Sequence, residues 1–421
     1  MKTWLTYLAA AAIGLAFQVN FKESSFFYSA MNFMANVTLK MGIFIVFPLV
    51  LVTMTSGTAS LTRKKGTNGF VWLSTIFWSL LTTVLLSVVA ALIFTAFPVA
   101  FPSTSSSSAT AEKAAQMVSA LSQSTVSKLS SANPLSVNLF LNLIKTSDCL
   151  IPIILVALVM GYALRPTNEV IRPAYMVLNS LSEVMFRLVK KISQLMWIAI
   201  FFIAGTWYET LWSDRTIFHS WRWVVMFCIV GFGVLLIIIP LIYAIATGFK
   251  RNPYTQIRRL LSASTAAFFS VNYMFSLPAL YTDCRINLGI QKRVVATALP
   301  LHSVITKGGS AMIGTLCSCS LVMAVSGRMP TTTEVITIAL ACTIVSFVSC
   351  LHAGYEVLFC SAMAMNLINS DATNMAVSIL GVLPMMNGIA LLFDTLLAGL
   401  GTSFTAVHLG ADCNIREKDI V

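Results

Sequence analysis

The sequence predicts an all-α integral membrane protein whose chain crosses the bilayer many times. Apolar residues make up 57% of the chain and charged residues only 10%, which is far from the usual balance of a soluble domain. Apolar runs recur that reach the roughly 20 residues a helix needs to cross a bilayer. In the second half of the chain, these runs are interrupted by Gly, Pro, Asn and isolated charges. We therefore expect the functional site in the second half.

The first 250 residues contain six apolar runs that are predicted to be membrane spans. No convincing small-residue cleavage site follows the first run, so it is not expected to be a removable signal peptide. The segment 102–136, which includes STSSSSATAEKAAQ, is Ser-rich and Pro-bounded and is predicted to be a flexible extracytoplasmic loop. The six runs lie near residues 4–21, 29–61, 69–98, 147–164, 194–206 and 223–248.

Two segments in the second half, 256–290 and 332–371, are each expected to form two half-length helices that meet at a tip. The first is interrupted at Asn272 and Pro278, and the second at residues 352–356. Broken helices at membrane depth persist only where their freed backbone groups line a cavity or are covered by protein. Paired interruptions of this kind mark the binding site of a transporter, because helix ends present their dipoles to the solute or ion. We therefore predict two re-entrant hairpins at a solute site.

The formal charge of the chain is +12, and the positions of its basic residues indicate the membrane topology rather than a nucleic-acid-binding surface. Basic residues cluster at the ends of the predicted spans, which satisfies the positive-inside rule when both termini are cytoplasmic. We therefore expect a multi-pass protein of the cytoplasmic (inner) membrane, with anionic lipid contact and no nucleic-acid partner. The clusters are Arg63, Lys64 and Lys65; Arg187, Lys190 and Lys191; Lys250, Arg251, Arg258 and Arg259; Lys292 and Arg293; and Arg416 and Lys418.

The sequence contains no recognisable catalytic or metal motif. The nine cysteines follow no metal spacing, and Cys317 and Cys319 stand too close together for a zinc pair. The Gly-x-Ser-x-Gly motif of a hydrolase is absent, and HSVITKGGS has no second acid nearby. We therefore expect a protein that is not an enzyme and has no cofactor or metal site, and we interpret His302 as a structural histidine.

Five segments resemble the dicarboxylate/amino acid:cation symporters, a family that includes glutamate transporters. The segment NPYTQIRRLLSASTAAFFSVNYMFSLP (252–278) is similar to the family's first hairpin, and TALPLHSVITKGGSAM (297–312) to its seventh span. VSILGVLPMMNGIALLFDTLLAGLGTS (377–403) lies where the family has its eighth span. LKMGIFIVFPLVLVTMTSGTASL (39–61) resembles the second span, and NPLSVNLF with PIILVALVMGYAL resembles the fourth. The segments follow the family's order, so the chain is identified as a divergent member.

The resemblance implies an elevator-type transporter fold with eight transmembrane helices plus two re-entrant helical hairpins, assembled as a homotrimer. Residues 1–101 would hold spans 1 to 3, with spans 1 and 2 in the scaffold and span 3 in the moving transport part. Residues 137–220 would hold scaffold spans 4 and 5. Residues 221–421 would form the transport domain, with span 6, hairpin 256–290, span 7, hairpin 332–371 and span 8.

The chain departs from the family's pattern at the ion sites that the resemblance implies. The seventh-span Asn, Met and Asp are Thr306, Lys307 and Gly308 here, and the last Asp of the eighth-span motif is Ala398. Carboxylates that hold sodium are thus missing at two positions, which argues against sodium coupling. We hypothesise that the Lys307 ammonium occupies the space of the ion, held in part by carbonyls freed between Gly308 and Gly309.

An unpaired charge within the membrane costs several kcal/mol, so Lys307 needs a partner. Asp394 is the first candidate and Glu356 the second. In the alternative, Lys307 points into a wet crevice or snorkels toward the interface. Glu356 is either a water-exposed tip residue or the carrier of a proton, because burial favours the neutral form of a carboxyl group. Both Na⁺ and H⁺ therefore stay open as the coupling ion.

The residues that hold an acidic amino acid in the family are also replaced. The Asp for the amino group falls at Asn387, and the Arg for the acidic side chain falls at Ala390. We expect a symporter-like secondary transporter of a small carboxylate or an amino acid. The alternative is a degenerate homologue that acts as a solute sensor or an ion conductor. The expected substrate-binding residues are Asn272, Ser276, Thr306, Lys307, Ser310, Tyr355, Glu356, Asn387 and Asp394.

Overall fold

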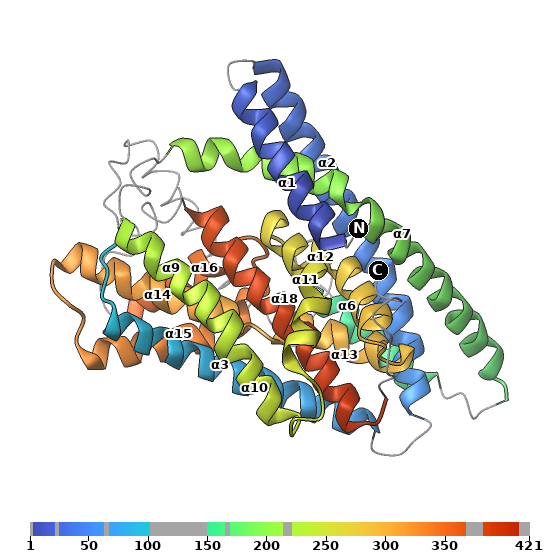
Figure 1. The fold of residues 1–421 in the computed structure, drawn as a ribbon. Coiled ribbons are helices and arrows are strands. Elements are labelled where there is room, and N and C mark those ends of the chain that lie inside the picture. The colour runs from blue at the N-terminus through green and yellow to red at the C-terminus, as the bar shows by residue number, and fades with distance from the viewer. Residues whose placement is uncertain are drawn as a thin grey trace.

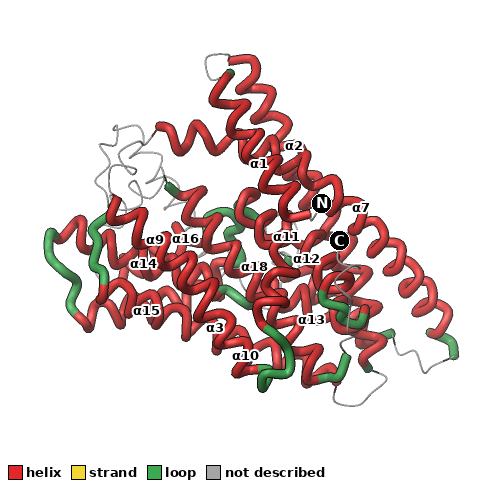
Figure 2. The backbone as a smooth tube through the Cα atoms, in the orientation of Figure 1, coloured by secondary structure: helices red, strands yellow, loops and turns green. Residues whose placement is uncertain are grey.

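The computed structural model describes residues 3–21, 25–62, 67–101, 150–164, 169–213, 221–367 and 382–411. These residues form helices that are joined by short loops (Figure 2). The Ser-rich loop predicted at 102–136 lies outside them, as do the starts of the fourth and eighth predicted spans and the end of the second hairpin. The all-α prediction is confirmed for the part of the chain that the structure describes.

Six helical stretches among the described residues are long and apolar enough to cross a membrane. The protein is therefore a multi-pass membrane protein, whereas the arrangement of eight spans with two re-entrant hairpins stays a prediction. The six stretches are α2 (Ser25–Leu61), α3 (Thr67–Ala96), α7 (Arg172–Ser213), the stretch Val225–Ala246 through α9 (Trp221–Gly233), η1 (Val234–Ile238) and α10 (Ile239–Ala246), α15 (Thr332–Ser349) and α18 (Leu383–His408).

The prediction for the fifth span was too short. The apolar run 194–206 is only the later part of α7, which continues unbroken from Arg172 to Ser213. Buried residues recur along this helix every three or four positions, so one face packs while the basic residues stay exposed on the others. The basic residues that precede the apolar run therefore do not interrupt α7. The buried residues of this face include Ser182, Phe186, Val189, Ser193, Met196 and Ile200.

A first group of helices contains α1 (Thr3–Asn20), α2, α6 (Ile151–Ala163) and α7. Figure 1 shows α1 and α2 in blue beside the long green α7. The backbones of α1 and α7 approach closely at Gly14, where an added Cβ would meet the carbonyl carbon of Phe201 at 3.1 Å. Tyr7 of α1 donates a hydrogen bond to the carbonyl of Ser193 on α7. The group is thus held by small residues and by buried polar contacts.

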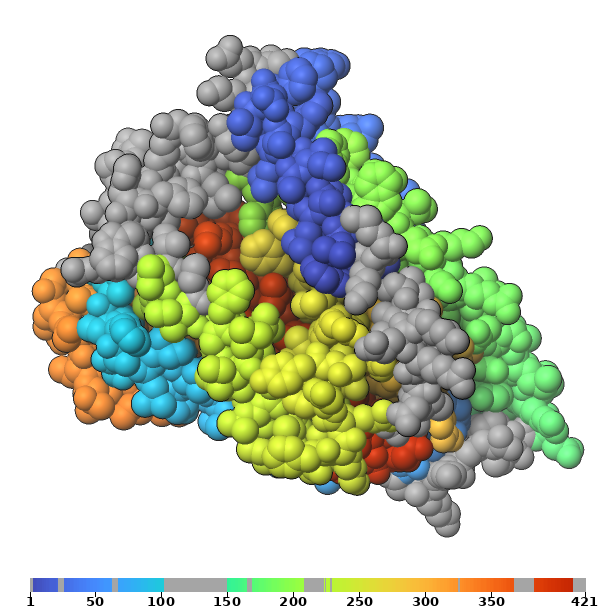
Figure 3. All heavy atoms as spheres, in the orientation of Figure 1, coloured from blue at the N-terminus to red at the C-terminus, as the bar shows by residue number. Residues whose placement is uncertain are grey.

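A second group of helices is built around α18, which is more deeply buried than the other five long apolar stretches. The Trp78 indole of α3 donates to the carbonyl of Leu397 on α18 at 2.9 Å. In Figure 3, α1 and the region of α10 lie on the viewer's face, and parts of α18 are visible between them. The helices that contact α18 include α3, α11 (Pro253–Ser270), α13 (Lys292–Ile305) and α14 (Gly308–Ser326).

Two helices joined by a sharp turn lie where the first hairpin is predicted. α11 ends at Ser270, the next residue, Val271, has a left-handed φ of 51°, and α12 (Tyr273–Thr282) begins after Asn272. The Asn272 side chain caps α12 by accepting hydrogen bonds from two backbone N–H groups of its first turn. Pro278 does not interrupt the helix, contrary to the prediction. Its ring removes one helical hydrogen bond, but every residue of α12 is buried and the packing holds the helix.

A buried carboxylate ties the two limbs of this hairpin together at its base. Asp283 begins η2 (Asp283–Asn287), which continues from α12. It accepts the Ser262 hydroxyl at 2.6 Å and the Ala263 N–H at 3.0 Å, both from α11. Asn287 donates a further hydrogen bond at 2.8 Å. The paired limbs therefore set the position of the turn at Asn272.

Two helices with a longer turn between them lie where the second hairpin is predicted, and the first of them, α15, is long enough to cross a membrane. α15 begins with a capping box in which Thr331 and Glu334 exchange hydrogen bonds. Residues 350–355, which we call the hairpin tip, then reverse the chain, and α16 (Glu356–Leu367) returns against α15. Gly354 has a φ of 90°, a conformation that residues with a Cβ rarely adopt. The predicted interruption at 352–356 overlaps this turn.

The seventh predicted span is divided into α13 and α14 by a break at Thr306 and Lys307. The expectation that the break lies between Gly308 and Gly309 was wrong, because both glycines are helical and begin α14. Their role is close packing. A Cβ added at Gly309 would lie 3.0 Å from Oδ1 of Asp394 on α18.

We expect Gly309→Ala to lower the melting temperature of the detergent-solubilised protein. The added methyl would press on Phe393 and Asp394 of α18, and overpacking of this kind costs about 1–3 kcal/mol. Gly231→Ala is the matched control, because its Cβ would point into open space in α9. That variant should keep or slightly raise the melting temperature. Equal melting temperatures for both variants would contradict the tight contact of α14 with α18.

Candidate functional site

The polar centre of the molecule lies where the α13–α14 break meets α12, the start of α16 and the middle of α18. Lys307 at the break and Glu356 at the start of α16 are both fully buried, and Asp394 of α18 is 3% exposed. Charged side chains are almost never buried unless they are paired. These three residues form the buried charge cluster, and their environment decides what the site can do.

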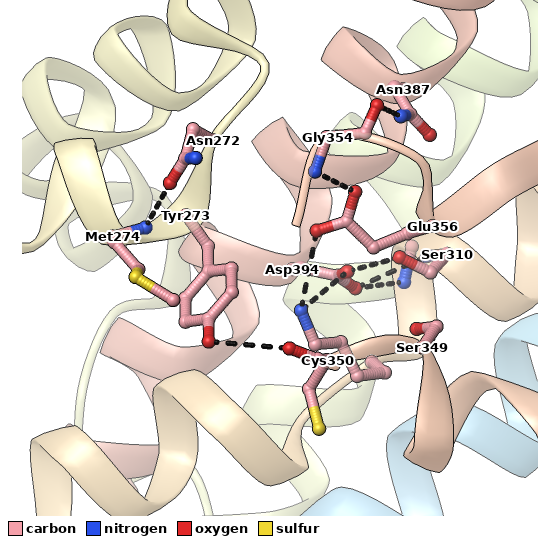
Figure 4. Close-up of polar contacts among 12 residues, drawn as sticks. Asn272, Tyr273, Met274, Ser310, Ser349, Cys350, Gly354, Glu356, Asn387 and Asp394 are labelled. Carbon is pink, nitrogen blue, oxygen red and sulfur yellow. Dashed lines mark hydrogen bonds and ion pairs between the residues drawn. The ribbon is translucent and has the colours of Figure 1, made fainter. Parts of the chain in front are cut away.

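The Lys307 ammonium lies between the two carboxylates of the cluster. Its Nζ atom is 4.0 Å from Glu356 Oε1 and 4.0 Å from Asp394 Oδ2. The ring of Tyr273, in the first turn of α12, has its centroid 4.4 Å from the same atom, which is a cation–π distance. Figure 4 shows Tyr273, Glu356 and Asp394 converging from different segments of the chain. Sequence-distant elements thus share one buried cation.

Asp394 is held firmly by the first turn of α14. Its Oδ1 accepts the N–H of Gly309 at 2.7 Å and the N–H of Ser310 at 3.2 Å, and its Oδ2 accepts the Ser310 hydroxyl at 2.6 Å. The first N–H groups of a helix have no partner within it, and its positive end attracts an anion. Asp394 therefore has a structural anchor in addition to its contact with Lys307.

Glu356 is held less completely. Its Oε2 accepts the N–H of Gly354 at 2.9 Å. Its Oε1 has no hydrogen-bond partner among the described residues, and the same is true of Nζ of Lys307. A buried polar group without a partner costs about 1–3 kcal/mol, and more when it is charged. The Lys307–Glu356 pair therefore has capacity for another polar group.

The cluster is also unbalanced in charge. With all three groups ionised, one ammonium faces two carboxylates, which leaves a net charge of −1. Uncompensated charge in an apolar interior is costly. The geometry therefore suits a site that takes up a proton or a cation, or that exchanges one anion for another at the ammonium.

Asn387 of α18 attaches the hairpin tip beside the cluster. Its Oδ1 accepts the N–H of Val357 at 2.8 Å, and its amide donates to the carbonyl of Gly354. The structure therefore brings part of the predicted substrate-binding set together at one place. These residues are Lys307, Ser310, Glu356 and Asp394, with Asn387 at the edge.

The other predicted residues lie around the cluster without facing its charges in this structure. Asn272 caps α12, and Ser276 donates to a carbonyl in its own helix at 2.8 Å. The Thr306 hydroxyl lies 2.8 Å from that of Ser79 on α3. Tyr355 is 39% exposed, on the outer side of the hairpin tip. Their role as solute ligands stays a prediction.

Tyr273 and Gly354 belong to the site but were not selected from the sequence. Tyr273 supplies the aromatic ring at Lys307, and Gly354 supplies the N–H that holds Glu356. Both residues neighbour a selected one, at the interruptions of the two hairpins. An aromatic residue directly after a break is a usable signal, whereas a backbone N–H leaves no trace in the sequence.

His302 lies among hydroxyl groups that join three helices. Its Nδ1 is 3.3 Å from the hydroxyl of Thr306, and its Nε2 is 3.3 Å from that of Thr405 and 3.4 Å from that of Thr75. These contacts connect α13 with α18 and α3. The geometry is that of a structural histidine.

The positions where the resemblance implies sodium carboxylates have other neighbours here. A Cβ added at Gly308 would meet methyl groups of Leu397 and Leu86 at 2.9 and 3.0 Å. The carbonyl of Ala398 accepts the hydroxyl of Thr402 at 2.9 Å. Hard cations prefer several oxygen ligands, and leucine methyl groups offer none. The side chains at these two positions therefore supply no carboxylate oxygen.

A cavity of about 640 Å³ opens toward the two hairpins from between the helix groups. Asn32 of α2 and Trp207 of α7 line one side, and Asn272, Gly354 and Tyr355 line the other. Gly354 also donates to Glu356. The hairpin tip is therefore the wall between this cavity and the buried charge cluster.

The chain matches the model of the sodium:dicarboxylate symporter family over residues 3–387. The match runs from α1 to the first residues of α18. It therefore includes both hairpins, the α13–α14 break and two members of the buried charge cluster, Lys307 and Glu356.

Curated relatives align with parts of the chain. The excitatory amino acid transporter of Caenorhabditis elegans is 29% identical over 111 residues, which are 26% of this chain and 22% of that protein. Neutral amino acid transporter A of Homo sapiens is 26% identical over 161 residues, 38% of this chain and 30% of that protein. Neutral amino acid transporter B(0) of Oryctolagus cuniculus is 25% identical over 164 residues, 38% of this chain and 29% of that protein. The alignments thus span less than a third of these relatives.

We expect Lys307→Met and Asp394→Asn to be strongly coupled in stability. Lys307→Met leaves both carboxylates without a cation, and removing one partner of a buried ion pair costs about 3–5 kcal/mol. In the double variant only one carboxylate, Glu356, is left without a cation, so the melting temperature should fall by less than the sum of the two single losses. Lys292→Met is the control, because this lysine is 22% exposed in its pair with Glu183. It should lose about 1 kcal/mol or less. Additive losses at Lys307 and Asp394 would contradict the pairing.

Proposed function

Because the chain belongs to the sodium:dicarboxylate symporter family, we propose that it is a secondary transporter of a small carboxylate or amino acid. Relatives that align with it are named as amino acid transporters. The observation that carries the proposal is the buried charge cluster, in which the ammonium of Lys307 has unused hydrogen-bond capacity behind the hairpin tip. Intramembrane ionisable residues of this kind mark solute and ion pathways.

The solute carboxylate binds to Lys307 in this proposal. An ammonium offers three donors, and charge-assisted hydrogen bonds to a carboxylate are stronger than neutral ones. Asn272 and Tyr355 line the approach from the cavity. Asn387 sets the position of the hairpin tip over the bound solute. Ser276, Ser310 and Thr306 supply hydroxyl groups at the surrounding helix ends.

Solute movement in this proposal does not depend on sodium. The loss of carboxylates at Gly308 and Ala398, with leucine side chains beside the first and a paired carbonyl at the second, supports this. Lys307 provides a fixed positive charge close to these positions. A tethered ammonium would stabilise Asp394 without a bound ion.

The transport step is an elevator movement of the second helix group against the first. The two groups meet where α2 contacts α12 and α13, where α7 contacts α11 and α12, and where α1 contacts α11. An ion-pair network crosses this boundary, with Glu183 of α7 3.1 Å from Arg285 and 3.2 Å from Lys292. These side chains are 22–40% exposed, so their pairs are weak enough to break and re-form.

The protein acts in the cytoplasmic membrane with both termini on the cytoplasmic side, as a homotrimer in contact with anionic lipid. The family resemblance and the basic clusters at helix ends support this arrangement. Large apolar side chains are exposed on the first helix group, where lipid or a second copy would cover them. Chemical cross-linking in native membranes tests the trimer.

We expect purified protein in liposomes to take up one or more labelled solutes from a panel of succinate, pyruvate, alanine and aspartate. Replacing external sodium by potassium should leave the uptake rate unchanged. Lys307→Met should reduce uptake more than tenfold, because the solute loses its cationic partner. Strong sodium dependence together with an unaffected Lys307→Met variant would exclude this proposal. Absence of uptake for the whole panel would favour a sensor or conductor.

We expect Glu183→Gln to raise the uptake rate by up to about fivefold, because a partly exposed ion pair contributes at most about 1 kcal/mol to holding the two helix groups together. Glu334→Gln is the matched control. Its partner Arg328, at 2.6 Å, lies in the same helix group, so this pair need not break during movement. Initial rates in liposomes compare the variants. An unchanged rate in Glu183→Gln would argue against movement at the α7 boundary.

A further inference from the structure

We propose that Glu356 occupies the place of the solute carboxylate at Lys307 when no solute is bound. Each carboxylate anion that displaces Glu356 from Lys307 is accompanied by one proton, which binds to Glu356. This inference rests on the proposed transport function and names its solute class and coupling ion. The solute is a small carboxylate without an ammonium group.

The first argument is the difference between the two carboxylates at Lys307. Asp394 accepts three hydrogen bonds from the start of α14 and cannot leave without disrupting that helix end. Glu356 accepts one hydrogen bond from another residue, Gly354, and its Oε1 faces the ammonium without a hydrogen bond. Glu356 is therefore the partner of Lys307 that a competing carboxylate can replace at the lower cost.

The second argument is the place of Glu356 in the fold. It is the first residue of α16 and follows the hairpin tip directly. Gly354 and Tyr355 of that tip line the cavity, while the N–H of Gly354 is bonded to Glu356. An anion that arrives from the cavity must therefore move the segment that carries Glu356 before it reaches Lys307. Displacement of Glu356 from Lys307 and opening of the hairpin tip therefore occur together.

The third argument is charge balance. Lys307, Asp394 and Glu356 together carry −1 when ionised. A monocarboxylate at Lys307 would make the total −2, and one proton on Glu356 restores −1. The solute oxygen forms an ion pair with Lys307, the Glu356 ion pair breaks, and a hydronium ion from the solvent on that side transfers its proton to Glu356 and becomes water. On the other side of the membrane the O–H bond of Glu356 breaks, its proton passes to water, the anion leaves and the Glu356 carboxylate returns to Lys307. The net movement is one anion with one proton.

The fourth argument concerns the solute. A second ammonium beside Lys307 would be repelled at short distance in a water-poor site. Asp394, the remaining carboxylate, already accepts three hydrogen bonds from α14. Pyruvate should therefore bind better than alanine, which has a similar size and carries the additional ammonium.

The titratable groups that surround or adjoin Glu356 are Lys307, Asp394, Tyr273, Cys360 on its own helix, and Cys350 and His352 in the hairpin tip.

The test measures pyruvate binding to the full chain in lipid nanodiscs by calorimetry from pH 5.5 to 7.5. If one proton is taken up per anion, the dissociation constant should fall with decreasing pH, by about tenfold per unit wherever Glu356 of the free protein is ionised. In Glu356→Gln this slope should vanish, and binding at pH 7.5 should become tighter. Glu334→Gln, in the first helix of the same hairpin, should keep the wild-type slope. Alanine should bind at least tenfold more weakly than pyruvate at every pH.

A flat pH profile in the wild type, or a slope that survives Glu356→Gln, would overturn the inference. Equal binding of alanine would overturn the solute class. Amide hydrogen exchange tests the role of Glu356 without any solute. It therefore separates failure of this inference from failure of the proposed transport function. At one fixed pH, Glu356→Gln and Lys307→Met should speed amide exchange in residues 350–357, and Glu334→Gln should not. Unchanged exchange in the first two variants would show that Glu356 does not hold the hairpin tip, whatever solute is carried.

Discussion

The burial of one ammonium between two carboxylates is the constraint on which the second half of this structure depends. Lys307 has no exposed surface, so its charge must be met by groups of the protein. Those groups come from α16 and α18, and the aromatic ring comes from α12. The helices must therefore converge at one place. Three helices, α12, α14 and α16, begin there. Broken helices supply this convergence because each break places a helix start next to the charge.

The first turns of α14 and α16 have different roles at the buried charge cluster. The start of α14 binds Asp394 through its free N–H groups, which fixes α18 against α14. Gly309 permits that approach, since a side chain there would press on α18. The start of α16 instead carries Glu356 itself, next to a turn that borders the open cavity. One carboxylate is thus part of the frame, and the other is attached to a segment that can move.

This asymmetry gives the proposed transporter a physical basis that differs from binding a free cation. The tethered ammonium cannot leave, so a solute anion competes with a carboxylate of the chain for it. The energetic cost of opening the hairpin tip is then offset by the incoming anion and its proton. Across the boundary to the first helix group, the exposed pairs of Glu183 hold the two parts only weakly.

The sequence by itself determined that the chain is a helical membrane protein with paired interruptions in its second half, because hydropathy and breaker residues act locally. It also identified Lys307, Glu356 and Asp394, since an intramembrane charge demands a partner. Only the tertiary structure decided that both carboxylates lie 4.0 Å from Lys307, that Asp394 is anchored by α14 and that Glu356 is not. It likewise placed the break at Thr306 rather than at the glycines and brought Tyr273 to the ammonium. These features depend on distances between segments far apart in the chain, and no local pattern records them.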